Sequence, residues 1–147
     1  MQDVRQGYCL PPSWTFVGCA HAVNLSGLTP FLCEVSRKTG TMTTKEATAA
    51  LTECSNSVPA LMPVNLFGEP VSVEELETLK RETGVKVVLE CAGGFDTFHP
   101  SSSLEISLHV ARLFSAGEGS LLITRDNELA ERVRRATNFG FSLHRAF

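Results

Sequence analysis

The feature of this sequence that most constrains its fold is the alternation of short apolar runs with amphipathic segments that begin at helix-capping residues. The run at 86–90 is apolar through its centre, as expected of a strand buried on both faces. Strands that alternate with helices predict a mostly parallel sheet with helices on both faces, a three-layer α/β fold. The expected strands lie at 8–10, 30–35, 58–66, 86–90, 106–108 and 120–124.

Polar residues mark the expected helix starts. Thr43 and Ser72 are each followed three residues later by a glutamate, which is the spacing of a capping box. Asp126 is expected to cap the last helix. A helix is also expected within 13–25, before Gly27. The residues of the last helix that are expected to face the core are Leu129, Val133 and Ala136.

Length and charge limit the classes of protein to which the chain can belong. With 147 residues, of which 43% are hydrophobic, residues 1–147 are expected to form a single domain. A net charge of −3 gives no basic footprint for nucleic acid. The apolar runs are too short to span a bilayer and the N-terminus lacks a signal peptide pattern. We therefore expect a cytoplasmic protein that binds neither nucleic acid nor membrane.

The cysteines favour reduced thiols over structural roles. There are five, which is an odd number, and no two are spaced as in a C-x-x-C motif. This pattern disfavours both a disulfide framework and a zinc site.

Several functional side chains follow the expected strands at their carboxyl ends, where ligands gather in parallel sheets. They are an aromatic residue, a carboxylate, a hydroxyl and a guanidinium: Phe16, Glu90, Ser107 and Arg112. Together they could hold a flat, anionic ligand that contains a ring nitrogen. Each also has a structural interpretation, since Phe16 alone is more often a core residue. Glu90 alone is more often a salt-bridge or helix-dipole partner.

Two other chemistries are weaker hypotheses. Cys91 could pair with His99 or His109 as a nucleophile, but a cysteine at a buried strand end is more often inert. His99, Glu105 and His109 could bind a metal, but their spacing matches no helix-face ligand pair.

Four ordered segments of the chain resemble the central part of the large domain of the DegT-type sugar aminotransferases. These enzymes depend on pyridoxal 5'-phosphate and have fold type I. The similarity extends from about Leu10 to Phe141. The segments are LPPSWTFVGCAHAVNLSGLTPFLCEV, PVNLFGEPVSVEEL, VVLECAGGFD and SLHVARLFSAGEGSLLITRDNELAERVRRATNFGF.

The resemblance implies a role for each candidate residue. Phe16 stands where the family stacks an aromatic ring on the cofactor, and Glu90 where an aspartate pairs with the pyridine nitrogen. Gly93 falls where many members carry glutamine or histidine near the cofactor hydroxyl. Ser107 matches a serine that binds the cofactor phosphate. Arg112 stands where the family has the lysine that forms the Schiff base.

The departures from the family pattern predict altered chemistry. Arginine stays protonated and is a poor nucleophile, so no covalent bond to the cofactor is expected at Arg112. Glu90 keeps the charge of the family's aspartate on an arm that is one methylene longer. The family's earlier phosphate-binding turn and its C-terminal domain have no counterpart in the chain, so a truncated copy is expected.

The resemblance therefore implies an aminotransferase that acts on a nucleotide sugar and an amino donor, impaired or inactive because of Arg112. The alternative is a non-catalytic pseudoenzyme fragment or an interaction subunit with the same fold. A homodimer is also implied, because members of this fold type commonly pair through the large domain.

Overall fold

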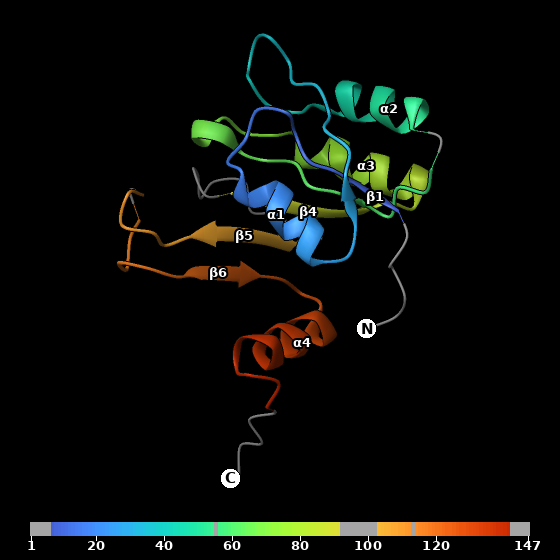
Figure 1. Ribbon diagram of the computed structural model, residues 1–147. Coiled ribbons are helices and arrows are strands. Elements are labelled where there is room, and N and C mark those ends of the chain that lie inside the picture. Colours follow the sequence, from blue (N-terminus) through green and yellow to red (C-terminus); the bar gives the residue numbers. More distant parts are fainter. Residues whose placement is uncertain (1–6, 55, 92–102, 113, 142–147) are drawn as a thin grey trace.

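The fold is built on one six-stranded sheet with the strand order β2-β1-β3-β4-β5-β6. The computed structural model describes residues 7–54, 56–91, 103–112 and 114–141 (Figure 1). The first five strands are parallel, and β6 pairs antiparallel with β5. The expectation of a mostly parallel α/β sheet is confirmed. The strands are β1 Tyr8–Leu10, β2 Thr29–Pro30, β3 Ala60–Leu61, β4 Lys86–Glu90, β5 Ser103–Ser107 and β6 Ser120–Ile123.

Helices α1 and α3 lie on opposite sides of the central strands (Figure 1). Leu89 of β4 and Leu104 of β5 pack with Leu76 of α3. A second cluster joins Leu10 and Leu61 to α2 and α3. Burial of each such leucine stabilises the fold by roughly 1.5–3 kcal/mol. The helices are α1 Gly18–Leu25, α2 Thr44–Glu53, α3 Val73–Thr83 and α4 Asn127–Thr137, and a short 3-10 helix spans Leu66–Gly68.

Two of the predicted strands are much shorter in the structure than in the expectation. The stretch 58–66 contributes only β3 and an isolated pairing of Val64 with Glu90, because Pro59 and Pro63 flank β3 and proline has no amide hydrogen for the ladder. The stretch 30–35 contributes only the end of β2, followed by an isolated pairing of Cys33 with Pro12. The strand expected at 106–108 is wrong in its bounds, since β5 starts at Ser103 and ends at Ser107.

The helix starts confirm the capping box at Thr43, whereas at Ser72 only the side-chain half of the predicted box is present. Both halves of the capping box are present at α2, where the Glu46 carboxylate accepts from the Thr43 amide at 3.1 Å. Hydrogen bonding from the Thr43 side chain lowers the pKa of Glu46. At α3 the Ser72 hydroxyl accepts from the Glu75 amide at 3.4 Å. The Glu75 carboxylate accepts from the Thr44 hydroxyl at 2.7 Å, so this side chain also ties α3 to α2.

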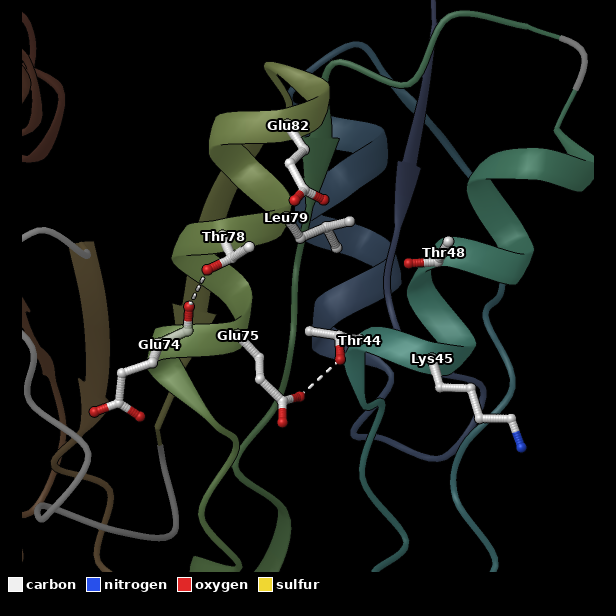
Figure 2. Close-up of a pocket in the computed structure, with 8 residues that line it drawn as sticks. All are labelled: Thr44, Lys45, Thr48, Glu74, Glu75, Thr78, Leu79 and Glu82. Carbon is white, nitrogen blue, oxygen red and sulfur yellow. Dashed lines mark hydrogen bonds between the residues drawn. The ribbon is translucent and has the colours of Figure 1, made fainter.

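That link crosses a groove between α2 and α3, shown in Figure 2. The groove contains none of the candidate residues at the strand ends. It is lined by Thr44, Lys45, Thr48, Glu74, Glu75, Thr78, Leu79 and Glu82.

Helix α4 differs from the expectation. Its cap is confirmed, since the Asp126 carboxylate accepts from the Leu129 amide at 2.9 Å. The prediction that one apolar face of α4 packs on the core is wrong. Ala136 is exposed, Leu129 and Val133 are only half-buried, and no residue of α4 is buried. The reason is position, because α4 follows the edge strand β6 and extends away from α2 and α3 (Figure 1).

The cysteines are all free thiols, and Cys54 alone among them is not buried. Burial raises the pKa of Cys9 to about 11, with a smaller contribution from the charge of Cys19. Burial likewise raises the pKa of Cys33 to about 11, with smaller contributions from the charges of Glu46 and Glu34. No helix in the described ranges is long and apolar enough to cross a membrane.

We expect Thr43→Ala to reduce the free energy of unfolding by about 1 kcal/mol, because it removes the side-chain half of the α2 capping box. Thr48→Ala is the matched control, since Thr48 is an exposed residue inside the same helix. Urea denaturation of both variants checks the prediction. Equal effects of the two substitutions would contradict the role of the cap.

Burial also predicts thiol reactivity. At pH 8 one thiol of the native protein should react rapidly with dithionitrobenzoate, and the other four should react only as the protein unfolds. Cys54→Ser should abolish the rapid phase. A rapid phase that survives this substitution would show that one of the buried thiols is accessible.

Candidate functional site

The candidate site lies where the parallel strands β1, β3, β4 and β5 end. The backbone there is held by hydrogen bonds between neighbouring strand ends. The Glu90 amide donates to the Pro63 carbonyl at 2.9 Å, and the Asn65 amide donates to the Glu90 carbonyl at 2.8 Å. Glu90 is half-buried, whereas Asn65 is 1% exposed. Glu90 therefore lies at a strand end whose backbone is held on both sides by hydrogen bonds.

Register places a second carboxylate beside Glu90. Glu90 of β4 pairs with Glu105 of β5, and residues in register on adjacent strands point to the same face. This is the face opposite to the one where Leu89 and Leu104 pack on α3. Burial raises the pKa of Glu105, while a hydrogen bond from the Ser120 side chain and the charge of Arg112 oppose that rise.

The start of α1 lies over the same face. Burial raises the pKa of the Cys19 thiol, and the negative charges of Glu90 and Glu105 raise it further. The hydrogen bond between Cys19 and the Thr15 side chain lowers this pKa and so opposes the rise. The Thr15 hydroxyl and the Cys19 sulfur are 3.3 Å apart. Cys19 is thus close enough to both carboxylates to sense their charge.

Phe16 precedes α1 and presents its ring to solvent, with 73% of the residue exposed. A Cβ atom built on Gly18 would lie only 2.9 Å from Cδ1 of this ring, so the ring rests against the glycine. Neighbouring Trp14 is 61% exposed. The structural interpretation of Phe16 as a core residue does not hold, and the ring is free to meet a flat ligand.

Ser107 and Arg112 belong to a hairpin that joins β5 to β6, drawn in orange in Figure 1. The hairpin is closed by backbone hydrogen bonds from Leu108 to Gly119 (2.9 Å) and from Val110 to Gly117 (2.8 Å). Ser107 pairs in register with Ser120 at its base. Arg112 is exposed, and its amide donates to the His109 carbonyl at 2.9 Å.

His109 makes its contacts inside the hairpin. Its Nδ1 accepts from the Ala111 amide at 3.1 Å, which leaves the ring proton on Nε2. Nε2 lies 3.5 Å from the Glu118 carboxylate. Cys91 is fully buried in the cluster on the α3 face. The geometry therefore does not favour a Cys91–His109 pair.

Two of the sequence-based candidates, Gly93 and His99, lie outside the described residues. Within the described ranges, no three histidine, cysteine or acidic side chains are grouped as metal ligands. The structure brings Glu90, Ser107 and the Arg112 hairpin to one edge of the sheet, with Phe16 at the start of α1.

Glu105 is the site residue whose place the sequence interpretation missed. In the sequence Glu105 is weighed only as a metal ligand and falls just before the strand expected at 106–108, whereas β5 starts at Ser103. The usable signal was the two-residue period of a strand, which puts Glu105 on the same face as Ser107.

Comparison with known proteins gives one consistent family. A model of the DegT/DnrJ/EryC1/StrS aminotransferase family matches residues 2–146. Protein Rv3402c of Mycobacterium tuberculosis H37Rv is 30% identical over 92% of this chain and 35% of its own length. The dTDP-4-amino-4,6-dideoxy-D-glucose transaminase of Shigella dysenteriae is 25% identical over 92% of this chain and 38% of its own length.

Solved structures agree with this result. DesV of S. venezuelae, crystallised with a ketimine intermediate, superimposes with a TM-score of 0.81 and 26% identity, over 96% of this chain and 39% of DesV. DesI, crystallised in the presence of its TDP-sugar product, gives a TM-score of 0.79 and 30% identity, over 93% of this chain and 36% of DesI. The chain thus spans little more than a third of the length of these relatives.

Proposed function

Because the chain belongs to the DegT/DnrJ/EryC1/StrS aminotransferase family, we propose that it is the cofactor-binding part of a sugar-nucleotide aminotransferase and does not carry out ordinary transamination. The observation that carries this proposal is the guanidinium of Arg112 on the hairpin after β5, where the family resemblance calls for the Schiff-base lysine. Enzymes of this family use pyridoxal phosphate, which supplies the electron sink for amino-group transfer when it is bound.

The described residues fit the cofactor as a non-covalent ligand. The exposed face of Phe16 can stack on a flat ring, and Glu90 offers a carboxylate to a protonated ring nitrogen. The Ser107 hydroxyl and the Arg112 guanidinium lie on the hairpin beyond, where they can bind a phosphate group. The proposed contribution of Gly93 falls on a residue outside the described ranges.

The same residues do not fit a covalent bond to the cofactor. Bond formation with an aldehyde needs a neutral amine, and arginine keeps its proton at any working pH. The lysine of the family would also move protons during transfer, and a positioned acid or base contributes about 10²–10⁴-fold to a rate. The loss of both roles accounts for the proposed loss of transamination.

The names of the relatives support the substrate class. The Shigella dysenteriae relative is a transaminase of a dTDP-linked sugar, and DesI was crystallised with a TDP-sugar product. We therefore assign a nucleotide sugar and an amino donor as the ligands of the complete site. A homodimer and a cytoplasmic location are part of this proposal.

A non-catalytic interaction subunit is the second candidate function. The observation that favours it is the unburied face of α4, together with exposed Phe139 and Phe141 just after the helix. An isolated helix of this length is marginal in water, so α4 gains stability from a surface that covers it. A subunit that served only this role would need no cofactor.

Titration with pyridoxal phosphate separates the two candidates. We expect saturable binding, detected as quenching of the fluorescence of Trp14, followed by complete loss of the ligand on dialysis. Borohydride treatment should leave no cofactor mass on the chain, and no amino group should transfer from glutamate. Cofactor attached at Arg112 would overturn the proposal, and absence of any binding would favour the interaction subunit.

Gly18→Ala should weaken cofactor binding about 2- to 10-fold, because the new Cβ displaces the Phe16 ring and stacking contributes about 0.5–1.5 kcal/mol. The melting temperature should stay the same or rise, since alanine favours the helix. Isothermal titration checks the affinity. In a Phe16→Leu background, Gly18→Ala should have no further effect; equal losses in both backgrounds would contradict the contact.

A further inference from the structure

His109 has no role in the proposed phosphate contacts, yet it lies between the two residues that make them. Ser107 stands two residues before it, and Arg112 stands three residues after it. The His109 side chain is 48% exposed, so packing against the core does not determine where the ring lies. The position of the imidazole therefore depends on its polar contacts within the hairpin.

On the side of Arg112, His109 forms two hydrogen bonds of a tight turn. Its carbonyl accepts from the Arg112 amide at 2.9 Å, which closes a β-turn over 109–112. Its imidazole Nδ1 accepts from the Ala111 amide at 3.1 Å. Asparagine and aspartate stabilise turns in this way, with a side-chain acceptor on the first residue that binds the amide two positions on. The imidazole takes the place of that acceptor here.

On the side of Ser107, the contact is with the hydroxyl that is proposed to bind phosphate. The His109 amide donates to Oγ of Ser107 at 3.3 Å. This hydrogen bond occupies one acceptor position of the hydroxyl and leaves its hydrogen available for donation. A phosphate oxygen is a strong acceptor for such a hydrogen. The contact therefore suits a serine that donates to a phosphate group.

The remaining contacts of this segment hold the backbone and the far side of the ring. Leu108 and Val110, on either side of His109, form backbone hydrogen bonds with the returning strand. Nε2 of His109 lies 3.5 Å from the Glu118 carboxylate, and the Glu118 side chain is 80% exposed. A pair as exposed as this contributes little to stability. The hydrogen bond from Ala111 to Nδ1 is thus the side-chain contact that shapes the turn.

We propose that His109 is a positioning residue, which holds Ser107 and Arg112 in the arrangement that binds a phosphate monoester before the ligand arrives. The inference rests on the proposed function for the identity of the ligand, because that proposal assigns Ser107 and Arg112 to the phosphate. A turn that is formed in advance lowers the entropic cost of ordering the loop when the ligand binds. Loss of the Nδ1 acceptor leaves the Ala111 amide without this partner and allows Arg112 to leave the turn in other directions.

Two substitutions separate the turn contact from the other contact of the ring. In His109→Asn the side-chain oxygen takes the place of Nδ1 and can accept from the Ala111 amide. In His109→Gln the longer side chain can still reach Glu118, but it carries no acceptor at the position of Nδ1. Because His109 is exposed, neither substitution changes the core.

Isothermal titration with pyridoxamine 5'-phosphate and with pyridoxamine measures the effect on phosphate binding. We expect His109→Gln to weaken binding of the phosphorylated ligand about 3- to 10-fold, as for the loss of one turn hydrogen bond. Binding of pyridoxamine, which lacks the phosphate, should not change. His109→Asn should bind both ligands within about twofold of the wild-type chain, because it keeps the acceptor.

Amide exchange with water, followed by NMR in the ligand-free chain, reports on the turn itself. Exchange of the Ala111 amide should be faster in His109→Gln than in the wild-type chain and unchanged in His109→Asn. Equal losses of affinity in the two variants, an unchanged affinity in His109→Gln, or an equal loss for pyridoxamine would overturn the proposal. Absence of binding by the wild-type chain would instead contradict the proposed function, and the exchange rates would still decide whether His109 holds the turn.

Discussion

The pairing of β4 with β5 is the interaction on which both the core and the candidate site depend. Its register sets Leu89 beside Leu104 on the face that packs on α3, and Glu90 beside Glu105 on the face below α1. A shift of β5 by one residue would exchange its two faces, which would turn Glu105 towards the core and expose Leu104 and Ile106. Burial of the leucines therefore fixes the place of the acids, and the energetic cost of a wrong register protects the geometry of the site.

The pairing of the antiparallel strand β6 with β5 also fixes the base of the hairpin that carries Arg112. Because β6 returns beside β5, Ser120 comes opposite Ser107, and the chain between them must close as a narrow loop that carries Arg112. The same strand forms the edge of the sheet in the described residues, which leaves α4 without a buried face. One strand thus both orders the site and leaves the amphipathic helix uncovered.

Local signals in the sequence predicted local structure well. Thr43 and Asp126 cap their helices as expected, because a cap depends on residues within one turn. The errors came from tertiary context. The face of α4 depends on what covers it, and the start of β5 depends on pairing with β4, which no period in the sequence reveals. Glu105 falls outside the strand expected at 106–108, whereas Glu90 and Ser107 stand at expected strand ends, where parallel sheets place ligands.

Arginine at position 112 determines what the hairpin after β5 can do to a ligand. A guanidinium is permanently protonated, so it can hold a phosphate group through charge and hydrogen bonds, but it cannot form a covalent bond with an aldehyde. Arg112 is exposed on a hairpin whose base is fixed by the pairing of Ser107 with Ser120, so its position at the end of the sheet depends on the backbone and not on a bound ligand. The fold that presents this side chain is that of the family.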